Sequence, residues 1–339
     1  MKKHIGILLA FVFLFSCLAG GAAPAEERKP VVVATIFPMY DWVREIIGGG
    51  DRADVTLLLD SGVDLHSYQP TAQDILKIST ADLLIYVGGE SDEWVEDVLA
   101  SAMNPNIRTV NLVEALGEDV KMEEIVEGME HEHDHDEADE EHEHEKEHGE
   151  EAHEGHGHEE EADEHVWLSL RNAQKLVQVI ADALAEFDTA HADVYQANAA
   201  AYAKKLKELD AQYSETVAGA DLKTILFGDR FPFRYLADDY GLTYYAAFSG
   251  CSAETEASFR TIVFLAQKVD ELGLPAVLTI EHPKTRIAET VVQATAAKDQ
   301  KILALDSMQG ITAQDIRGGV TYLSIMESNL AVLRQALTK

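Results

Sequence analysis

The sequence predicts an α/β protein of two lobes, each with a parallel sheet, that are joined by a long rigid helix. Apolar runs alternate with amphipathic stretches in the first third of the chain, and the same alternation returns after residue 221. Between these parts, residues 170–218 are rich in helix-forming residues and contain no proline. Alternating strands and helices imply parallel sheets with right-handed crossovers, and 339 residues suffice for about two domains. We therefore expect two lobes that face each other across a cleft.

The first lobe, expected over residues 30–168, begins with a continuous apolar run that is typical of a strand buried on both faces. Pro38 opens the following helix, and three consecutive glycines end it. Thr71, with Asp74 three residues later, is typical of a helix N-cap. The predicted strands are 31–37, 54–59, 83–87 and 107–110, and the predicted helices are 38–47, 71–79 and 92–100.

Two linker helices are predicted over residues 170–218, the first ending near Phe187 and the second near Val217. The second lobe is expected over residues 221–339, where the alternation of strands and helices restarts. Its predicted strands are 223–227, 243–247, 276–280 and 301–305, and its predicted helices are about 231–239, 256–272, 284–297 and 318–337.

Residues 118–164 break this alternation, because they are acidic and of low complexity. They hold 24 acidic residues against two lysines, and ten of the 14 histidines of the chain fall between His131 and His165. Such a segment buries too little apolar surface to fold alone, so we expect residues 118–164 to be disordered without a ligand. The net charge of −34 also leaves nothing basic to neutralise phosphates, which excludes a general nucleic-acid binder.

Residues 1–25 are predicted to be a secretory signal peptide. A short positive start precedes an apolar run of about eleven residues, which is too short to span a bilayer permanently. The residues before Cys17 resemble a bacterial lipobox, in which that cysteine is lipidated; cleavage near residues 23–25 is the alternative. Either way we expect an extracytoplasmic protein, membrane-anchored or periplasmic. Cys251 then has no disulfide partner, and we interpret it as a small buried apolar residue, with metal ligation as the alternative.

Polar side chains follow several predicted strands, at the edge where open α/β sheets bind their ligands. His66 follows the second strand, Asp229 follows the strand that ends at 227, and Asp306 follows the strand that ends at 305. His165 lies where the acidic segment returns to ordered chain. We therefore expect two imidazoles and up to two carboxylates to converge here from both lobes, a mixture that suits Zn²⁺ or Mn²⁺.

Two motifs resemble the first and second metal-ligand motifs of the zinc and manganese solute-binding proteins of bacterial ABC importers. They are GVDLHSYQPTAQD at 62–74 and DEHVWLSLRNA at 163–173. Later segments resemble further parts of the same family, namely FRYLADDYGL at 233–242, EAS at 256–258, LDS at 305–307 and GVTYLSIMESNL at 319–330. Many zinc-type members also carry a His-rich acidic insertion between the first two motifs. The resemblance covers nearly the whole mature chain.

The resemblance implies a metal ion bound between the lobes, with His66, His165 and Asp306 as ligands. It also implies delivery of the ion to an ABC permease driven by an ATPase, and we expect a monomer. The third ligand position of the family falls here on Arg230, and a guanidinium offers no lone pair to a metal. We predict that Asp229 substitutes while Arg230 pairs with an acidic neighbour. The alternatives are water or a histidine of the acidic segment, a loss of tight binding, or Glu281 in reserve.

Imidazole ligands favour zinc, two carboxylates shift a site towards manganese, and the many histidines of the acidic segment favour zinc again. That segment is interpreted as a low-affinity collector of zinc, or else as a solvated tail. Two other functions compete with the receptor. One is an extracellular zinc buffer or adhesin that uses the segment alone. The other is a metallo-hydrolase with Glu281 or Glu254 as general base, but the chain lacks HExxH, GxSxG and phosphate-loop motifs, so we expect no enzyme.

Overall fold

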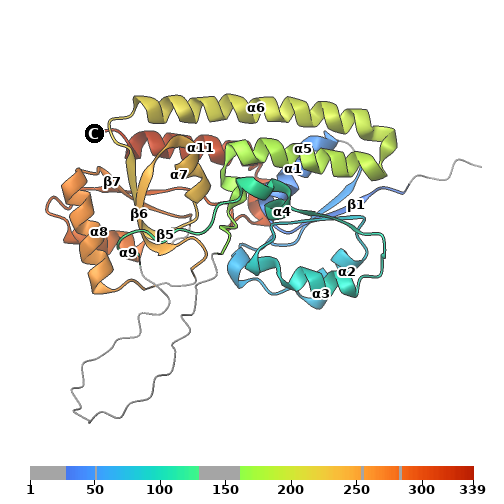
Figure 1. The fold of residues 1–339 in the computed structure, drawn as a ribbon, viewed down its shortest axis with the longest axis horizontal. Helices are drawn as coiled ribbons and strands as arrows, with labels where there is room; N and C mark the ends of the chain where they lie inside the picture. Colours follow the sequence, from blue (N-terminus) through green and yellow to red (C-terminus); the bar gives the residue numbers. More distant parts are fainter. Residues whose placement is uncertain (1–27, 50–51, 130–160, 253–255, 282–284) are drawn as a thin grey trace, which may run out of the picture.

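The computed structural model describes residues 28–49, 52–129, 161–252, 256–281 and 285–339. Within them the chain forms two α/β lobes, each with a four-stranded parallel sheet, and long helices join the lobes (Figure 1). The predicted fold class is confirmed. The predicted signal peptide with Cys17, and the histidines at 131–158, lie outside the described residues.

The first lobe contains a sheet with the strand order β2-β1-β3-β4. Its strands are β1 (Val31–Ala34), β2 (Asp54–Leu57), β3 (Leu83–Tyr86) and β4 (Arg108–Asn111). The helices are α1 (Phe37–Ile47), α2 (Ala72–Ser79), α3 (Trp94–Ala100) and the short α4 (Leu112–Leu116). The central strands β1 and β3 are almost fully buried, which explains their continuous apolar sequence. The sequence did not predict α4, a single turn that Asn111 caps.

The second lobe repeats this arrangement with the strand order β6-β5-β7-β8. Its strands are β5 (Thr224–Phe231), β6 (Thr243–Ser249), β7 (Ala276–Thr279) and β8 (Lys301–Ala304). Its helices are α7 (Arg234–Tyr240), α8 (Phe259–Leu272), α9 (Arg286–Ala294), α10 (Ala313–Arg317) and α11 (Tyr322–Ala336). The last predicted helix, 318–337, corresponds to α11, which begins later because Thr321 is its N-cap, and α10 was not predicted.

Strand β5 differs most from the prediction. It extends to Phe231 instead of ending at 227, and its pairing with β6 shifts register between Phe227 and Arg230. Arg230 therefore lies within the strand and not in the loop after it. The following helix begins only at Arg234, later than predicted, because the strand occupies the preceding residues.

Helices α5 (Leu170–Phe187) and α6 (Ala192–Gly219) lie where the linker helices were predicted. Figure 1 shows α6 running along both lobes. The Asn198 amide donates to Ile46 O of α1 at 3.0 Å, and the Tyr213 hydroxyl donates to Met326 O of α11 at 2.6 Å. One cluster of buried apolar side chains is continuous from β1 through these helices to α11. The linker is thus packed against both lobes along its length, which favours a fixed placement of the lobes.

The described ends of the acidic segment are ordered, so the prediction of disorder over 118–164 is wrong there. Met122 and Ala162 form an antiparallel bridge, Glu123 N donates to Glu161 O at 2.8 Å, and the Met129 side chain is 6% exposed. The reason is that apolar residues such as Val120 alternate with the acids at these ends and pack on the core.

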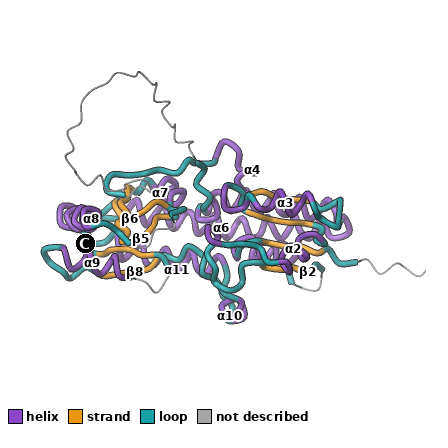
Figure 2. The backbone as a smooth tube through the Cα atoms, turned by 90° about the horizontal axis from the view of Figure 1, so that it is seen from below, coloured by secondary structure: helices purple, strands orange, loops and turns teal. Residues whose placement is uncertain are grey.

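Residues that follow strands of the two sheets meet in the middle of the molecule, where Figure 2 shows loops between the lobes. Ser61 and Thr312 form an antiparallel bridge between the lobes, and Ala313 N donates to Asp60 O at 2.7 Å. Loops that follow strands of both lobes therefore meet here. Among the helices of the described ranges, none combines the length and hydrophobicity needed to cross a membrane.

Candidate metal centre

His66 is held by its own loop in the first lobe. It sits in a single 3-10 turn (Leu65–Ser67) after β2, and its backbone N donates to the Asp64 carboxylate at 3.0 Å. Its side chain is 8% exposed. On the far side of the ring, Nδ1 lies 2.8 Å from Ser91 Oγ, which belongs to the loop after β3. Two neighbouring strand-end loops thus fix the imidazole.

His165 is fully buried at the end of the acidic segment, just before a 3-10 turn (Val166–Leu168). Asp163 Oδ1 accepts both His165 N at 2.8 Å and His165 Nδ1 at 3.0 Å. The second lobe holds this segment. The Tyr235 hydroxyl donates to Asp163 O at 2.8 Å, and Tyr322 donates to Trp167 O at 2.7 Å. This imidazole therefore depends on contacts from both lobes.

The two imidazoles face each other, with His66 Nε2 and His165 Nε2 3.1 Å apart. The hydrogen-bond pattern assigns their protons. His165 Nδ1 must donate, because the Asp163 carboxylate only accepts. Ser91 Oγ gives its proton to Glu164, so it accepts from His66 Nδ1. With both rings neutral, the two Nε2 atoms turn lone pairs towards each other, an arrangement that a cation between them stabilises.

Behind the pair, Glu164 completes this support. Its carboxylate accepts from Ser91 N at 2.8 Å as well as from Ser91 Oγ. A Cβ at Gly89 (φ +81°) would lie 2.4 Å from Glu164 Oε1, so only glycine leaves room for this carboxylate. Burial raises the pKa of Glu164, against the opposing effect of its hydrogen bonds with Ser91. Partners of this kind orient metal-bound histidines in proteins.

The pKa of His66 is lowered to about 3, mainly by burial; the neighbouring His165 and Arg230 also lower it, whereas Asp64 acts in the opposite direction. The ring is therefore neutral at any physiological pH. A neutral imidazole is the form that binds a metal ion.

Cys251 is the third side chain at this place. Its Sγ and the ring nitrogens of His66 and His165 lie within 4.8 Å of one another. It follows β6, and burial strongly raises the pKa of its thiol. Cys251 is half-buried, so it is less buried than the apolar interpretation predicts, and that interpretation does not predict its position beside the histidines.

The predicted carboxylate ligands stand outside this group of three, as far as the described residues go. Asp229 accepts from Arg230 N at 2.9 Å and Ile280 N at 3.3 Å. Asp306 accepts from Met308 N at 2.7 Å. The structure thus brings His66 and His165 together, and ligation by the two aspartates stays a prediction.

Arg230 and Glu281 have contacts of their own. The Arg230 guanidinium forms an ion pair with Asp64, across the lobes, as expected for an arginine with an acidic neighbour. Glu281 holds the loop after β8. Its Oε1 accepts from Ser307 Oγ at 2.8 Å and from Gln309 N at 3.1 Å. Glu281 thus acts as a support for the loop that carries Asp306.

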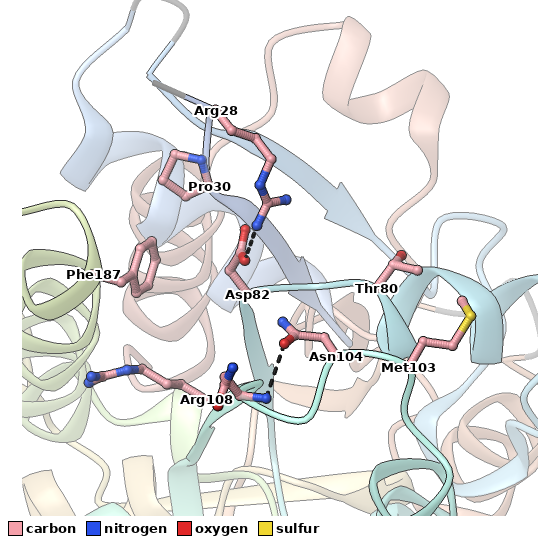
Figure 3. Close-up of a pocket in the computed structure, with 9 residues that line it drawn as sticks. Arg28, Pro30, Thr80, Asp82, Met103, Asn104, Arg108 and Phe187 are labelled. Atoms are coloured by element: carbon pink, nitrogen blue, oxygen red, sulfur yellow. Dashed lines mark hydrogen bonds and ion pairs between the residues drawn. The ribbon is translucent and has the colours of Figure 1, made fainter. Parts of the chain in front are cut away.

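A separate cavity of about 640 Å³ lies at the opposite, amino edge of the first sheet (Figure 3). Pro30, Asp82 and Arg108 line it, at the beginning of β1, β3 and β4. An ion pair between Arg28 and Asp82 crosses its wall. None of the predicted ligands lines this cavity.

Comparisons with known proteins identify the family of this chain. The family model of the periplasmic component A of zinc-uptake complexes matches residues 32–336. A zinc-binding protein AdcA of Streptococcus pyogenes is 32% identical over 98% of this chain, which spans 61% of that relative's length. The high-affinity zinc uptake system protein ZnuA of Bacillus subtilis is 30% identical over 99% of this chain and 98% of its own.

Solved structures show the same fold. The Zn(II)-bound ZnuA-like domain of Streptococcus pneumoniae AdcA has a TM-score of 0.68 and 27% identity, covering 92% of this chain and 100% of that one. The metal-dependent lipoprotein YcdH of Bacillus subtilis has a TM-score of 0.70 and 27% identity, with the same coverage. With a family model that spans both lobes, the chain belongs to the family of periplasmic component A proteins of zinc-uptake complexes.

Proposed function

We propose that this chain captures Zn²⁺ between its lobes and delivers it to an ABC permease for import. The observation that carries the proposal is the imidazole pair, in which both Nε2 atoms face each other at 3.1 Å while both Nδ1 atoms have acceptors. Buried imidazoles supported in this way supply half of a proposed metal site before any metal arrives.

The names of the relatives support zinc as the cargo. The streptococcal relatives are called zinc-binding proteins, and the relative from Bacillus subtilis a high-affinity zinc uptake protein. This chain spans about three-fifths of the streptococcal relatives but nearly all of the Bacillus protein. The part that matches both is therefore the metal-receptor part. Manganese is the weaker candidate, because imidazole donors favour zinc.

We propose His66 and His165 as ligands, with Asp306 from the facing loop. Asp229 is the fourth member of the predicted set, and its substitution belongs in the same test. The partners proposed are the permease and ATPase of the importer, with the receptor acting as a monomer. The family is periplasmic by description, and anchoring through Cys17 is proposed for this chain. The family is one of receptors, and no catalytic step is proposed.

The test is zinc titration of the full chain against a strong competing chelator, which reports only tight sites. The unaltered chain should bind one Zn²⁺ tightly, and His66→Ala and His165→Ala should each weaken binding about a hundredfold or more. His191→Ala is the matched control. His191 also lies beside a carboxylate, Asp188, at 2.9 Å, but on the linker. Equal affinity of all four proteins would place zinc binding in the acidic segment and favour the buffer function instead.

A further inference from the structure

We propose that Cys251 is a protein ligand of the metal between the lobes and takes the role that Arg230 cannot fill. This inference rests on the proposed capture of zinc and adds a thiolate to the site. The juxtaposition that carries it is Cys251 Sγ beside two imidazoles whose nitrogens lie within 4.8 Å of it and of each other.

The backbone around Cys251 is fitted to this position. A Cβ at the preceding Gly250 would lie 3.1 Å from His165 Cε1 and 2.9 Å from Phe231 O, so a side chain there would push the turn away from the imidazole. Cys251 N donates to Glu123 Oε1 at 3.1 Å, which ties the turn to the ordered beginning of the acidic segment. Two contacts independent of any metal thus bring the thiol to the histidines.

The neighbouring candidates for the same role have other partners. The Arg230 guanidinium pairs with Asp64, and its Nη1 lies 3.4 Å from Ser252 O. Both carboxylate oxygens of Asp229 accept backbone N–H groups, from Arg230 and Ile280. Among the described residues, Asp229 is not part of the group in which donor atoms lie within 4.8 Å of one another. The sulfur of Cys251 belongs to that group, together with one nitrogen of each imidazole.

The chemistry of the set fits zinc. On binding, the Cys251 thiol releases its proton to solvent and the sulfur binds as a thiolate, while the neutral imidazoles bind through Nε2. Imidazole and thiolate are both ligands of tetrahedral zinc sites, and a fourth position is left for Asp306 or water. A thiolate is a soft donor that favours zinc over manganese. Cys251 is thus a specificity-determining residue of the site.

Cobalt(II) gives the direct test, since only a cobalt–sulfur bond gives an intense charge-transfer band in the near ultraviolet. The chain has two cysteines, Cys17 and Cys251, and the histidines of the acidic segment cannot produce this band. The full chain with Cys17→Ser, kept reduced, should show the band on adding Co²⁺ and lose it on adding Zn²⁺. Adding Cys251→Ser should abolish the band.

Zinc affinity by chelator competition gives the second readout. Cys251→Ser should weaken zinc at least about tenfold, the loss typical of removing even an outer-shell partner. Asp229→Asn is the matched comparison and should change affinity by less than Cys251→Ser. Cys251→Ser should also reduce the preference for zinc over manganese.

The outcomes separate the two proposals. Tight zinc binding without a cobalt–sulfur band in the Cys17→Ser chain would overturn ligation by Cys251 and leave the proposed function standing. A larger loss with Asp229→Asn than with Cys251→Ser would overturn it too. Failure of the unaltered chain to bind zinc tightly would overturn both. The band itself is read without altering Cys251, so misfolding of a Cys251 variant cannot hide the answer.

Discussion

The two sheet edges that face each other differ in how far their polar groups are prepared for a metal. On the first-lobe side, His66 and His165 turn their Nε2 atoms to one point, and Ser91, Asp163 and Glu164 hold them from behind. On the second-lobe side, the carboxylates of Asp229 and Asp306 accept backbone N–H groups of their own lobe.

This difference indicates that the two edges contribute differently to zinc binding. The first-lobe side is a preorganised half-site, whose histidines need little reorientation on binding. The second-lobe side offers a thiol close to the histidines and, among the described residues, two carboxylates that are not part of that group. Substitutions of the residues that hold the histidines should therefore change zinc affinity strongly. Substitutions at Arg230 should mainly change the stability of the contact between the lobes, through its ion pair with Asp64.

The largest effect in this comparison is expected from Asp163→Asn. The carboxylate fixes His165 with its Nδ1 protonated and its Nε2 free, and an amide can turn its NH₂ group to Nδ1 and stabilise the opposite tautomer. Zinc affinity should fall about tenfold to a hundredfold, the range for partners behind a metal-bound histidine. Chelator competition measures it.

Asp188→Asn is the control for this substitution. Asp188 holds His191 Nδ1 in the same manner, at 2.9 Å, but on the linker and away from the group of three ligands. The zinc affinity of the Asp188→Asn variant should match that of the unaltered chain. Equal losses of zinc affinity in both variants would mean that the two aspartates act through folding. That result would contradict the proposal that Asp163 preorganises the half-site.

A smaller effect is expected at the ion pair between Arg230 and Asp64, whose side chains are 12% and 14% exposed. Arg230→Ala leaves the Asp64 carboxylate half-buried without its cation, so the metal-free protein should lose stability. A double-mutant cycle with Asp64→Asn should show a coupling free energy of about 1–2 kcal/mol, measured by urea unfolding with a chelator present.

The exposed pair of Lys204 and Glu208 on α6 serves as the reference, with side chains 78% and 63% exposed. Water screens such a pair, so its cycle should give no measurable coupling. If the pair of Arg230 and Asp64 gave the same result, Arg230 would have no structural role at the contact between the lobes. Its presence at the family's ligand position would then be unexplained.

The sequence predicted the fold well because each lobe follows local rules. Buried parallel strands read as apolar runs, and proline-free stretches of helix formers became α5 and α6. The errors lie where tertiary contacts decide. β5 continues past 227 through an irregular pairing with β6, and apolar residues order the ends of the acidic segment.

The site was predictable only in part, for a similar reason. His66 and His165 follow from strand ends and motifs. Ser91 carried no signal, because its contact with Glu164 joins residues 73 positions apart. Cys251 could have been found, since it lies just past the end of a predicted strand. Its apolar character favours a core residue, whereas its place after the predicted strand 243–247 also fits the rule for polar residues at strand ends.

The smallest effect is expected at Asp41, which connects α1 to the start of α11. Its side chain is 3% exposed, and its Oδ2 accepts from Tyr322 N, the first residue of α11, at 2.8 Å. Burial raises its pKa from 3.8 to about 6, outweighing the hydrogen bond with Tyr322. The folded state therefore holds a proton that the unfolded state has lost between these two pH values. Stability falls as pH rises through this window, and the cost is complete at pH 7.

Asp41→Asn removes the buried charge and keeps an oxygen for Tyr322 N, so it should stabilise the metal-free protein. The shift of about two units sets a limit near 3 kcal/mol, and we expect about 1 kcal/mol at pH 7 because the neutral amide accepts a weaker hydrogen bond. Urea unfolding at pH 7 and near pH 4 measures it, and the gain should shrink at the lower pH, where Asp41 is protonated in the folded state. A variant that is less stable than the unaltered chain at pH 7 would mean that the ionised carboxylate holds the lobes together. The contact between α1 and α11 would then depend on the charge of Asp41 as well as on packing.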